Sequence, residues 1–228
     1  MAIDLILKSL YAWTPFLAGG FIWNVVISLV AMGVGTGCGY LLACSRLSSH
    51  KVLSKTGHAM TELMRNAPTF VFQFYLVFML PSELPLPFTA LHIPLPSWLK
   101  ASLALALAVA GFVSDNLLRT LRAWQEGSRR DALLFMLNWS NYFVIIVMAS
   151  STASVIGVPE LVSRCNTVIN ATGKTDIMLW VYLYAMTWFF LFCFIATTLI
   201  RKLSDRLDRR FHIPAAEVEV AATDNAAV

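Results

Sequence analysis

Residues 21–45 read FIWNVVISLVAMGVGTGCGYLLACS and contain no Asp, Glu, Lys or Arg. A bilayer core of about 30 Å is spanned by about 20 apolar residues in an α-helix. The stretch is therefore long enough to cross a membrane once. Its backbone polar groups find partners in lipid only if it is helical. This segment predicts an integral membrane protein rather than a soluble domain.

The composition of the whole chain points the same way. Its 228 residues are 58% hydrophobic and 13% charged, and the mean hydropathy is +0.69. Soluble domains are about 45–50% apolar and about 25% charged. The composition excludes an ordinary soluble enzyme, a disordered chain and a coiled coil. The functional question becomes what the chain passes, holds or senses across a bilayer.

Further apolar stretches extend the prediction to five membrane spans in an all-α membrane protein. We expect these spans at residues 21–45, 60–80, 98–118, 132–155 and 177–200. Residues 1–20 include Asp4 and Lys8 and lack a signal-peptide cleavage site, so they predict an amphipathic helix over 3–18 at the membrane interface. Residues 21–213 then form the membrane domain, and the tail 214–228 is expected to be disordered.

The basic residues predict the orientation, because Lys and Arg collect in cytoplasmic loops. With five spans, 13 of the 17 basic residues fall on one side. They are Arg46, Lys51, Lys55, Arg65, Arg119, Arg122, Arg129, Arg130, Arg201, Lys202, Arg206, Arg209 and Arg210. Lys8, Lys100, Arg164 and Lys174 fall on the other side. We therefore expect an external N-terminus and a cytoplasmic C-terminus. Topology explains the net charge of +4 without nucleic-acid binding.

Polar residues in or beside the second and fourth spans are the candidates for a solute path or its gate. They are Gln73, Asn141, Ser150, Ser151 and Thr152. Polar side chains in membrane helices often hydrogen-bond between helices. Their clustering is equally consistent with a polar route, and the sequence leaves both interpretations open.

Charged residues near the spans suggest local pairs. Glu62 and Arg65 are three residues apart, and Asp115 and Arg119 are four apart, so each pair shares a helix face. Structural pairing is one interpretation. A gate or an interface is the other, because ionisable residues in spans usually face an aqueous path or a partner.

Small residues alternate in the first span, at Gly33, Gly35, Gly37 and Gly39. Spacings of four permit close helix contact, so packing is favoured over a phosphate-binding role. The four cysteines lack metal-ligand spacing, the histidines are scattered, and there is no Walker motif. We expect no catalytic residues, no metal and no cofactor in this chain.

The chain resembles the permease subunit of bacterial ABC importers of the polar amino-acid type, the histidine/glutamine/arginine class. Residues 153–161 read ASVIGVPEL, identical to part of the family's KDTSLASVIGVPEL. Residues 62–68, ELMRNAP, are similar to its ELFRGTP. Weaker similarities follow the same order: LLACSR at 41–46, GFVSD at 111–115 and NWSNYF at 138–143.

The resemblance implies a type I ABC importer transmembrane fold paired with a like subunit in the bacterial inner membrane. It also implies two cytoplasmic ATPase subunits that bind Mg-ATP and an external substrate-binding protein. Nucleotide-driven closure of the ATPases would switch the paired permeases from inward- to outward-facing. The topology expected from the basic residues agrees with that family.

One family feature is missing. Relatives carry a cytoplasmic loop with an EAA motif, whose coupling helix docks on the ATPase. Here Leu121 is followed within a few residues by QEGSRRD at 125–131. Three explanations are open. In the first, the chain is one half of a heterodimer whose partner keeps the coupling helix. Alternatively it couples through this short segment, with Gln125, Glu126, Arg129, Arg130 and Asp131 as the ATPase contacts. A third alternative is a non-transporting assembly or regulatory subunit.

Overall fold

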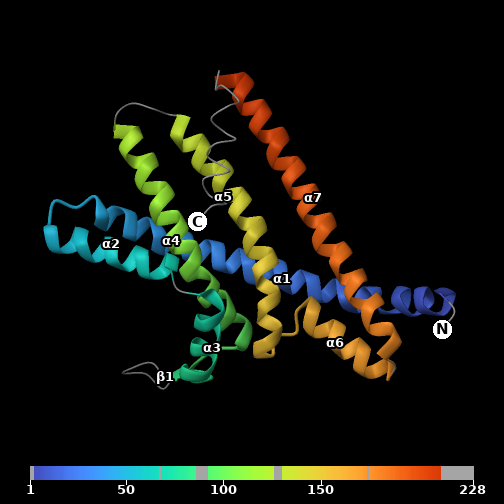
Figure 1. Cartoon of the computed structure of the whole chain (residues 1–228). Helices are drawn as coiled ribbons and strands as arrows, with labels where there is room; N and C mark the ends of the chain where they lie inside the picture. Colours follow the sequence, from blue (N-terminus) through green and yellow to red (C-terminus); the bar gives the residue numbers. More distant parts are fainter. Residues whose placement is uncertain (1–2, 67, 86–91, 126–129, 174, 212–228) are drawn as a thin grey trace.

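A computed structural model describes residues 3–66, 68–85, 92–125, 130–173 and 175–211 (Figure 1). For several residues at the ends of these segments only the backbone is described. They are residues 3–5, 84–85, 92–93, 124–125, 130–131, 175 and 207–211. The expected disordered tail, residues 214–228, lies outside the described part of the chain.

The described chain is almost entirely helical, and the prediction of an all-α fold is confirmed at this level. Its helices are α1 (Ile3–Arg46), α2 (Lys51–Asn66), α3 (Thr69–Met79), α4 (Ser97–Gln125), α5 (Arg130–Ala149), η1 (Ser150–Ile156), α6 (Leu161–Thr172), η2 (Thr175–Ile177) and α7 (Met178–Phe211), of which η1 and η2 are 3-10 helices. The strands β1 (Glu83–Pro85) and β2 (His92–Pro94) pair antiparallel, with Leu84 opposite Ile93.

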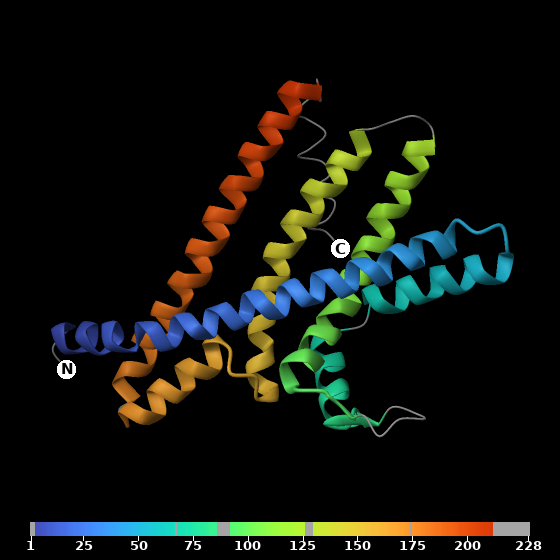
Figure 2. The same cartoon turned by 180° about the vertical axis from the view of Figure 1, so that it is seen from behind.

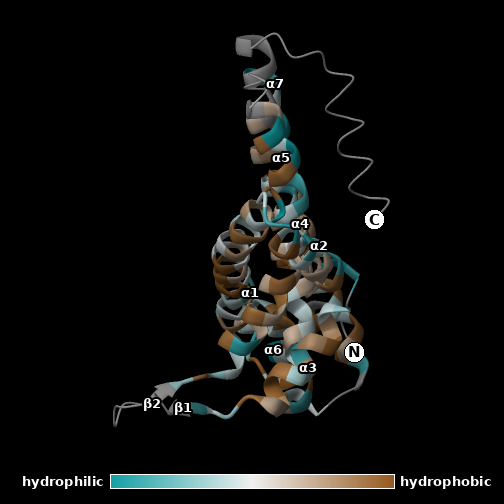
Figure 3. Ribbon diagram, turned by 90° about the vertical axis from the view of Figure 1, so that its left-hand side faces the viewer, coloured by the Kyte–Doolittle hydropathy of each residue, from teal (hydrophilic) through white to brown (hydrophobic). Residues whose placement is uncertain are grey.

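Four helical segments are long and apolar enough to cross a membrane. They cover Ile6–Arg46, Ser97–Ala123, Ala132–Ile156 and Met178–Arg206. They overlap the first, third, fourth and fifth expected spans; the main differences are the earlier start of the first and the later ends of the third and fifth. Figure 3 shows hydrophobic positions around the crossing of α1 with the other helices and more hydrophilic ones where α4, α5 and α7 extend away from it. The length and apolar composition of these four helices make the chain a multi-pass membrane protein.

The expected N-terminal interfacial helix is not a separate element. Residues 3–18 continue without interruption into the first span, and α1 is a single helix of 44 residues. Pro15 lies inside it and only removes one N–H from the ladder. Gly19 and Gly20 follow Pro15 but do not end the helix, because Arg164 and the start of α6 pack closely against them. The expected boundary at residue 20 is therefore wrong.

The expected second span at 60–80 is also not a single helix. It is divided between α2 and α3, with Pro68 as the residue before α3 in an extended conformation (φ −63°, ψ 118°). Proline has no N–H to donate and disfavours helical backbone in the preceding residue, which explains the break. The apolar half, α3, has only 11 residues. A fifth uninterrupted span is thus absent from the described segments.

Helix α1 organises the molecule by lying across the other long helices (Figure 2). Its main contact is with α4, where a Cβ at Gly35 would lie 2.7 Å from the Ala106 carbonyl oxygen. A Cβ at Gly39 would lie 2.8 Å from that of Ala110. Only glycine permits this approach. At Gly33 and Gly37, by contrast, a Cβ would have nothing within 4 Å, so these two glycines face away from α4.

Two hydrophobic clusters hold the helices together. The larger contains Ile27, Met32, Leu105, Val109 and Ile156 and joins α1, α4, α5 and η1. The smaller joins the N-terminal part of α1 to α6 and α7. Helix α7 is otherwise nearly unpacked, because only 6% of its apolar window is buried inside the chain.

Candidate translocation site

The break before α3 and the change from α5 to η1 bring two of the expected path residues together. The Thr152 hydroxyl on η1 lies 2.8 Å from the Oε1 atom of Gln73 on α3, and Gln73 is fully buried. Irregular backbone at membrane depth is tolerated where protein buries it or where it lines a cavity. The hydrogen bond between these two broken helices is the strongest candidate for a gate.

The Gln73 amide is only partly satisfied. Its Nε2 amino group is buried and has no hydrogen-bond partner among the described residues. The Thr152 hydroxyl also lies 2.7 Å from the carbonyl oxygen of Ala149. A hydroxyl has one hydrogen, so the two carbonyl oxygens compete for it. If the contact between α3 and η1 opened, the Thr152 hydroxyl would keep its hydrogen bond to Ala149. The free-energy cost of opening at Thr152 would therefore be small.

Other expected path residues lie in different surroundings. Ser150 is fully buried and bonds within the protein, whereas Ser151 is half-buried and donates only to the Met148 carbonyl oxygen, 2.8 Å away. Asn141 is half-buried on α5. The structure therefore joins Gln73 to Thr152 and leaves Asn141 apart from that pair.

A second polar cluster lies close to η1 and was not expected from the sequence. Asn24 on α1 donates through Nδ2 to Ser150 Oγ and to Glu160 Oε2, each at 2.9 Å. The backbone N–H of Leu161 donates to Asn24 Oδ1 at 3.1 Å. Asn24, Ser150 and Glu160 are all 0% exposed. The signal was an asparagine within an uncharged span, which usually bonds across helices.

Glu160 also caps helix α6. Its Oε1 atom accepts from the N–H of Ser163 at 2.9 Å. A carboxylate is favoured at a helix N-terminus, where N–H groups lack partners. Burial raises the pKa of Glu160 above its ordinary value, and the hydrogen bonds from Asn24 and the backbone act in the opposite direction.

Asp115 pairs between helices rather than along its own helix. Its Oδ1 atom lies 2.6 Å from Nη1 of Arg46 on α1, and its Oδ2 atom 3.4 Å from Nη1 of Arg65 on α2. The expected partner, Arg119, is exposed and makes no ion pair with Asp115. Glu62 is exposed, and Arg65 turns to Asp115 instead. The expected local pairs are thus replaced by a link joining α1, α2 and α4.

Lys100 secures the other end of α3. Its ammonium group is buried and donates to the carbonyl oxygens of Leu80 at 2.7 Å and Val77 at 3.3 Å. The last carbonyls of a helix lack partners and favour a cation. From the sequence alone, this residue was only a charge inside one of the expected spans.

The expected ATPase contacts fall in the connection between α4 and α5. Helix α4 ends at Gln125 and α5 begins at Arg130, and both residues and Asp131 are described by backbone alone. Glu126 and Arg129 lie outside the described residues. The segment between the two helices is short, as the sequence indicates.

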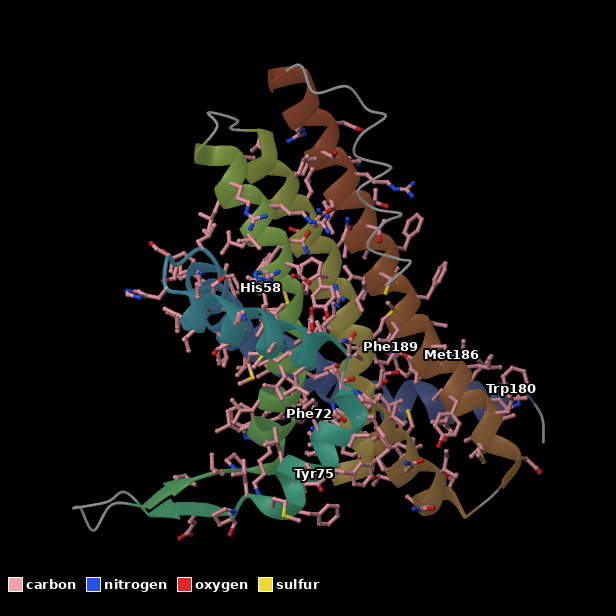
Figure 4. The ribbon with its side chains drawn as sticks, turned by 60° about the vertical axis from the view of Figure 1, so that its left-hand side comes forward. His58, Phe72, Tyr75, Trp180, Met186 and Phe189 are labelled. Atoms are coloured by element: carbon pink, nitrogen blue, oxygen red, sulfur yellow. The ribbon has the colours of Figure 1, made fainter. Side chains whose placement is uncertain are left out.

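An exposed face is shared by α2, α3 and α7. Figure 4 shows His58, Phe72, Tyr75, Trp180, Met186 and Phe189 projecting on this side. Tyr75 is 63% exposed and Met186 64% exposed. Phe72 and Phe189 are half-buried, and Trp180 is 40% exposed. The exposed large side chains Tyr75, Trp180 and Met186 mark a surface that meets lipid or another protein.

Comparison with solved structures identifies the architecture. The chain matches one chain of the "Crystal structure of an amino acid ABC transporter with histidines", with a TM-score of 0.71 over 87% of this chain and 97% of that one. This is an ABC transporter fold. The two sequences share 16% identity, so the likeness between them is one of fold. No family model matches the sequence, and no curated protein matches it.

Within the ABC transporter fold, the two polar clusters lie where helices begin, end or break. Neither cluster has the makings of a metal site, because the described residues contain no group of three His, Cys, Asp or Glu side chains. The arrangement provides hydrogen bonds between the ends of helices that are far apart in the sequence.

Proposed function

We propose that the chain is the permease subunit of an ATP-binding-cassette importer for amino acids or similar small polar solutes. The observation that carries this proposal is the ABC transporter fold over nearly the whole length of a transporter chain. The motifs ELMRNAP and ASVIGVPEL add support, because they lie at the two helix breaks that meet through Gln73 and Thr152.

The contact between Gln73 and Thr152 is the closed gate in this proposal. The full burial of Gln73 against Thr152 supports a closed state of this contact. Its unpartnered amino group favours a second state in which solute or water supplies the missing acceptor. Ser151 and Asn141 remain candidates for lining the route in that second state.

The partners follow from the same proposal. A second permease, carrying an intact coupling helix, covers the exposed face of α2, α3 and α7. Two ATPase subunits bind Mg-ATP on the cytoplasmic side, and a substrate-binding protein delivers the solute from outside. The chain lies in a bacterial inner membrane with its N-terminus outside and its C-terminus in the cytoplasm.

One observation favours a second candidate function. Only residues 126–129 separate α4 from α5, which leaves no room for a coupling helix between them. A non-transporting assembly or regulatory subunit on the same scaffold would have no need of such a helix. The two candidates differ in whether an ATPase is bound.

The test is purification of the tagged full-length chain from its native membrane in mild detergent. Under the import proposal an ATPase and a second permease copurify, and the complex in liposomes takes up solute only with ATP and the binding protein. Purification of the chain with other membrane proteins and no ATPase would reject import and support the assembly role.

A further inference from the structure

We infer that Glu160, acting through Asn24 and Ser150, is a positioning residue that holds η1 in the orientation in which Thr152 meets Gln73. This role rests on the proposed gate and deepens it. It gives a function to the cluster formed by Asn24, Ser150 and Glu160, which no part of the transport proposal uses.

The cluster satisfies the Asn24 amide completely. Its Nδ2 group donates both hydrogens, to Ser150 and Glu160, and its oxygen accepts from the N–H of Leu161. An amide offers two donor hydrogens and one acceptor oxygen for such bonds. The orientation of the side chain is therefore fixed from three directions, by η1 and by two successive residues at the start of α6.

Close packing of α1 on the first residue of α6 also holds the α6 backbone next to Asn24. A Cβ at Gly20, one turn before Asn24 on α1, would lie 2.9 Å from the Leu161 Cα atom. The absence of a side chain at Gly20 lets the start of α6 approach α1 closely enough for Leu161 to reach Asn24. The hydrogen bond from the Leu161 N–H to Asn24 and the close packing at Gly20 therefore both fix the start of α6 against α1.

Fixing Ser150 determines where Thr152 lies. Both residues belong to η1, in which each residue is turned by about 120° from the one before. Ser150 donates to the Val147 carbonyl oxygen at 2.7 Å and accepts from Asn24, so the first residue of η1 cannot rotate freely. Thr152, two positions later, is then presented to Gln73.

The chemistry of the cluster requires an acceptor at position 160 and a donor at position 24. Glu160 receives N–H bonds on both carboxylate oxygens, from Asn24 and from Ser163. In Glu160→Gln the single amide oxygen can accept from Asn24 or from Ser163 but not from both, so an amino group faces one of these two donors. In Asn24→Asp two carboxylates would face each other. The double variant N24D/E160Q exchanges the roles and restores a donor opposite an acceptor between positions 24 and 160. Position 24 then keeps its bond to η1 through the Ser150 hydroxyl, which donates its hydrogen to the new carboxylate at position 24 in place of the Val147 carbonyl oxygen.

The experiment measures the exposure of η1 without relying on transport. Ser151→Cys is introduced into the full chain with Cys38, Cys44 and Cys193 replaced by Ala, and its labelling by a water-soluble maleimide is timed. Ser151 suits this purpose because its side chain bonds only to Met148 in its own helical turn. Solute uptake by the purified complex and thermal unfolding are measured on the same variants.

We expect each single variant, N24D or E160Q, to change the labelling rate about tenfold, the effect of losing one hydrogen bond to a charged group. The double variant should return labelling and uptake toward the parent values. The control N166A removes a different α6 bond, accepted from the Tyr182 hydroxyl at 2.5 Å, and should change neither.

The positioning role is overturned if the single variants label like the parent, or if the double variant behaves like the singles. If the single variants fail to fold, Ser150→Ala decides, because it removes the bond from Asn24 to η1 and leaves Glu160 in place. Unchanged labelling in Ser150→Ala would also overturn it. Absence of uptake in the complex of the unsubstituted chain, measured alongside, would reject the import proposal and leave the labelling result intact.

Discussion

A single hydrogen on the Thr152 hydroxyl serves two carbonyl oxygens, that of Ala149 and that of the Gln73 side chain. Together with the unpartnered Gln73 amino group, this makes the pair a weak point; among the described side chains only Arg46 Nε is likewise buried without a partner. Buried polar groups without partners are costly and persist in native proteins for a reason. At this position the reason we propose is gating.

Replacing Gln73 should separate stability from function. Gln73→Leu removes the unpartnered amino group, so the chain should be as stable as the parent or up to about 1 kcal/mol more stable. Solute uptake should nevertheless fall. Thermal unfolding in detergent and uptake into liposomes measure the two effects.

The matched variant is Thr152→Val. It removes the hydroxyl that donates to Gln73 Oε1, so that neither polar atom of the Gln73 side chain has a hydrogen-bond partner among the described residues. It should lower the free energy of unfolding by about 1–3 kcal/mol. Normal uptake in Gln73→Leu would remove this residue from the gate.

Cys165 should be the slowest of the described cysteines to react. It is fully buried on α6, and burial together with the nearby Glu160 carboxylate raises its pKa to about 12. Only the thiolate is nucleophilic, so at pH 8 its reactive fraction is about a thousandfold below that of a thiol of ordinary pKa. Mass spectrometry after maleimide treatment should find Cys38 and Cys44, which are exposed, modified first. Early modification of Cys165 would show that α6 opens readily.

At the scale of elements, the long helices were predictable and their partners were not. Uncharged apolar runs identify spans, since lipid permits little else. The break at Pro68 follows from proline chemistry, although the apolar run led us to expect one span over 60–80 rather than two helices. Nothing in the local pattern could join Asn24 to Glu160, 136 positions later, or direct Arg65 to Asp115 instead of Glu62. The partner of each polar side chain depends on which helix faces pack together in the fold. Hydrophobic periodicity within one segment does not predict that packing.

Two glycines of α1 should respond in opposite ways to the same substitution. Gly39→Val inserts a side chain against Val113 and the Ala110 carbonyl oxygen and should destabilise the fold by about 1–3 kcal/mol. Gly37→Val meets open space and should leave unfolding unchanged. Thermal unfolding of both variants in one detergent makes the comparison. Equal losses would contradict the close packing of α1 on α4 at Gly39.

Lys100 should be essential for the end of α3. In Lys100→Met the carbonyl oxygens of Leu80 and Val77 lose a charged donor, at a cost of about 1.5–3 kcal/mol. Limited proteolysis should then cut more readily after α3. The exposed Lys55→Met is the control and should stay within about 0.5 kcal/mol of the parent. Similar cutting in both variants would contradict the assigned role of Lys100.

At the scale of the whole molecule, α7 is left without cover, with only 6% of its apolar window buried in the chain. If a second permease covers it, Met186→Cys on the exposed face should crosslink to a partner of similar size in native membranes. A cysteine at Gly33, on the open face of α1, serves as the comparison. Crosslinking at neither position, with the chain still monomeric, would argue against pairing through α7.

The length of α1 has a consequence for the surrounding lipid. With 44 residues it extends over about 66 Å, roughly twice the thickness of a bilayer core. A straight helix of that length must tilt strongly or emerge from the hydrocarbon, and α1 is also packed across α4, α5 and α7 at a large angle (Figure 2). Its tilt is therefore tied to the arrangement of the whole bundle. Lipids with longer acyl chains would favour a more upright α1, so membrane thickness becomes a physical variable to which this protein responds.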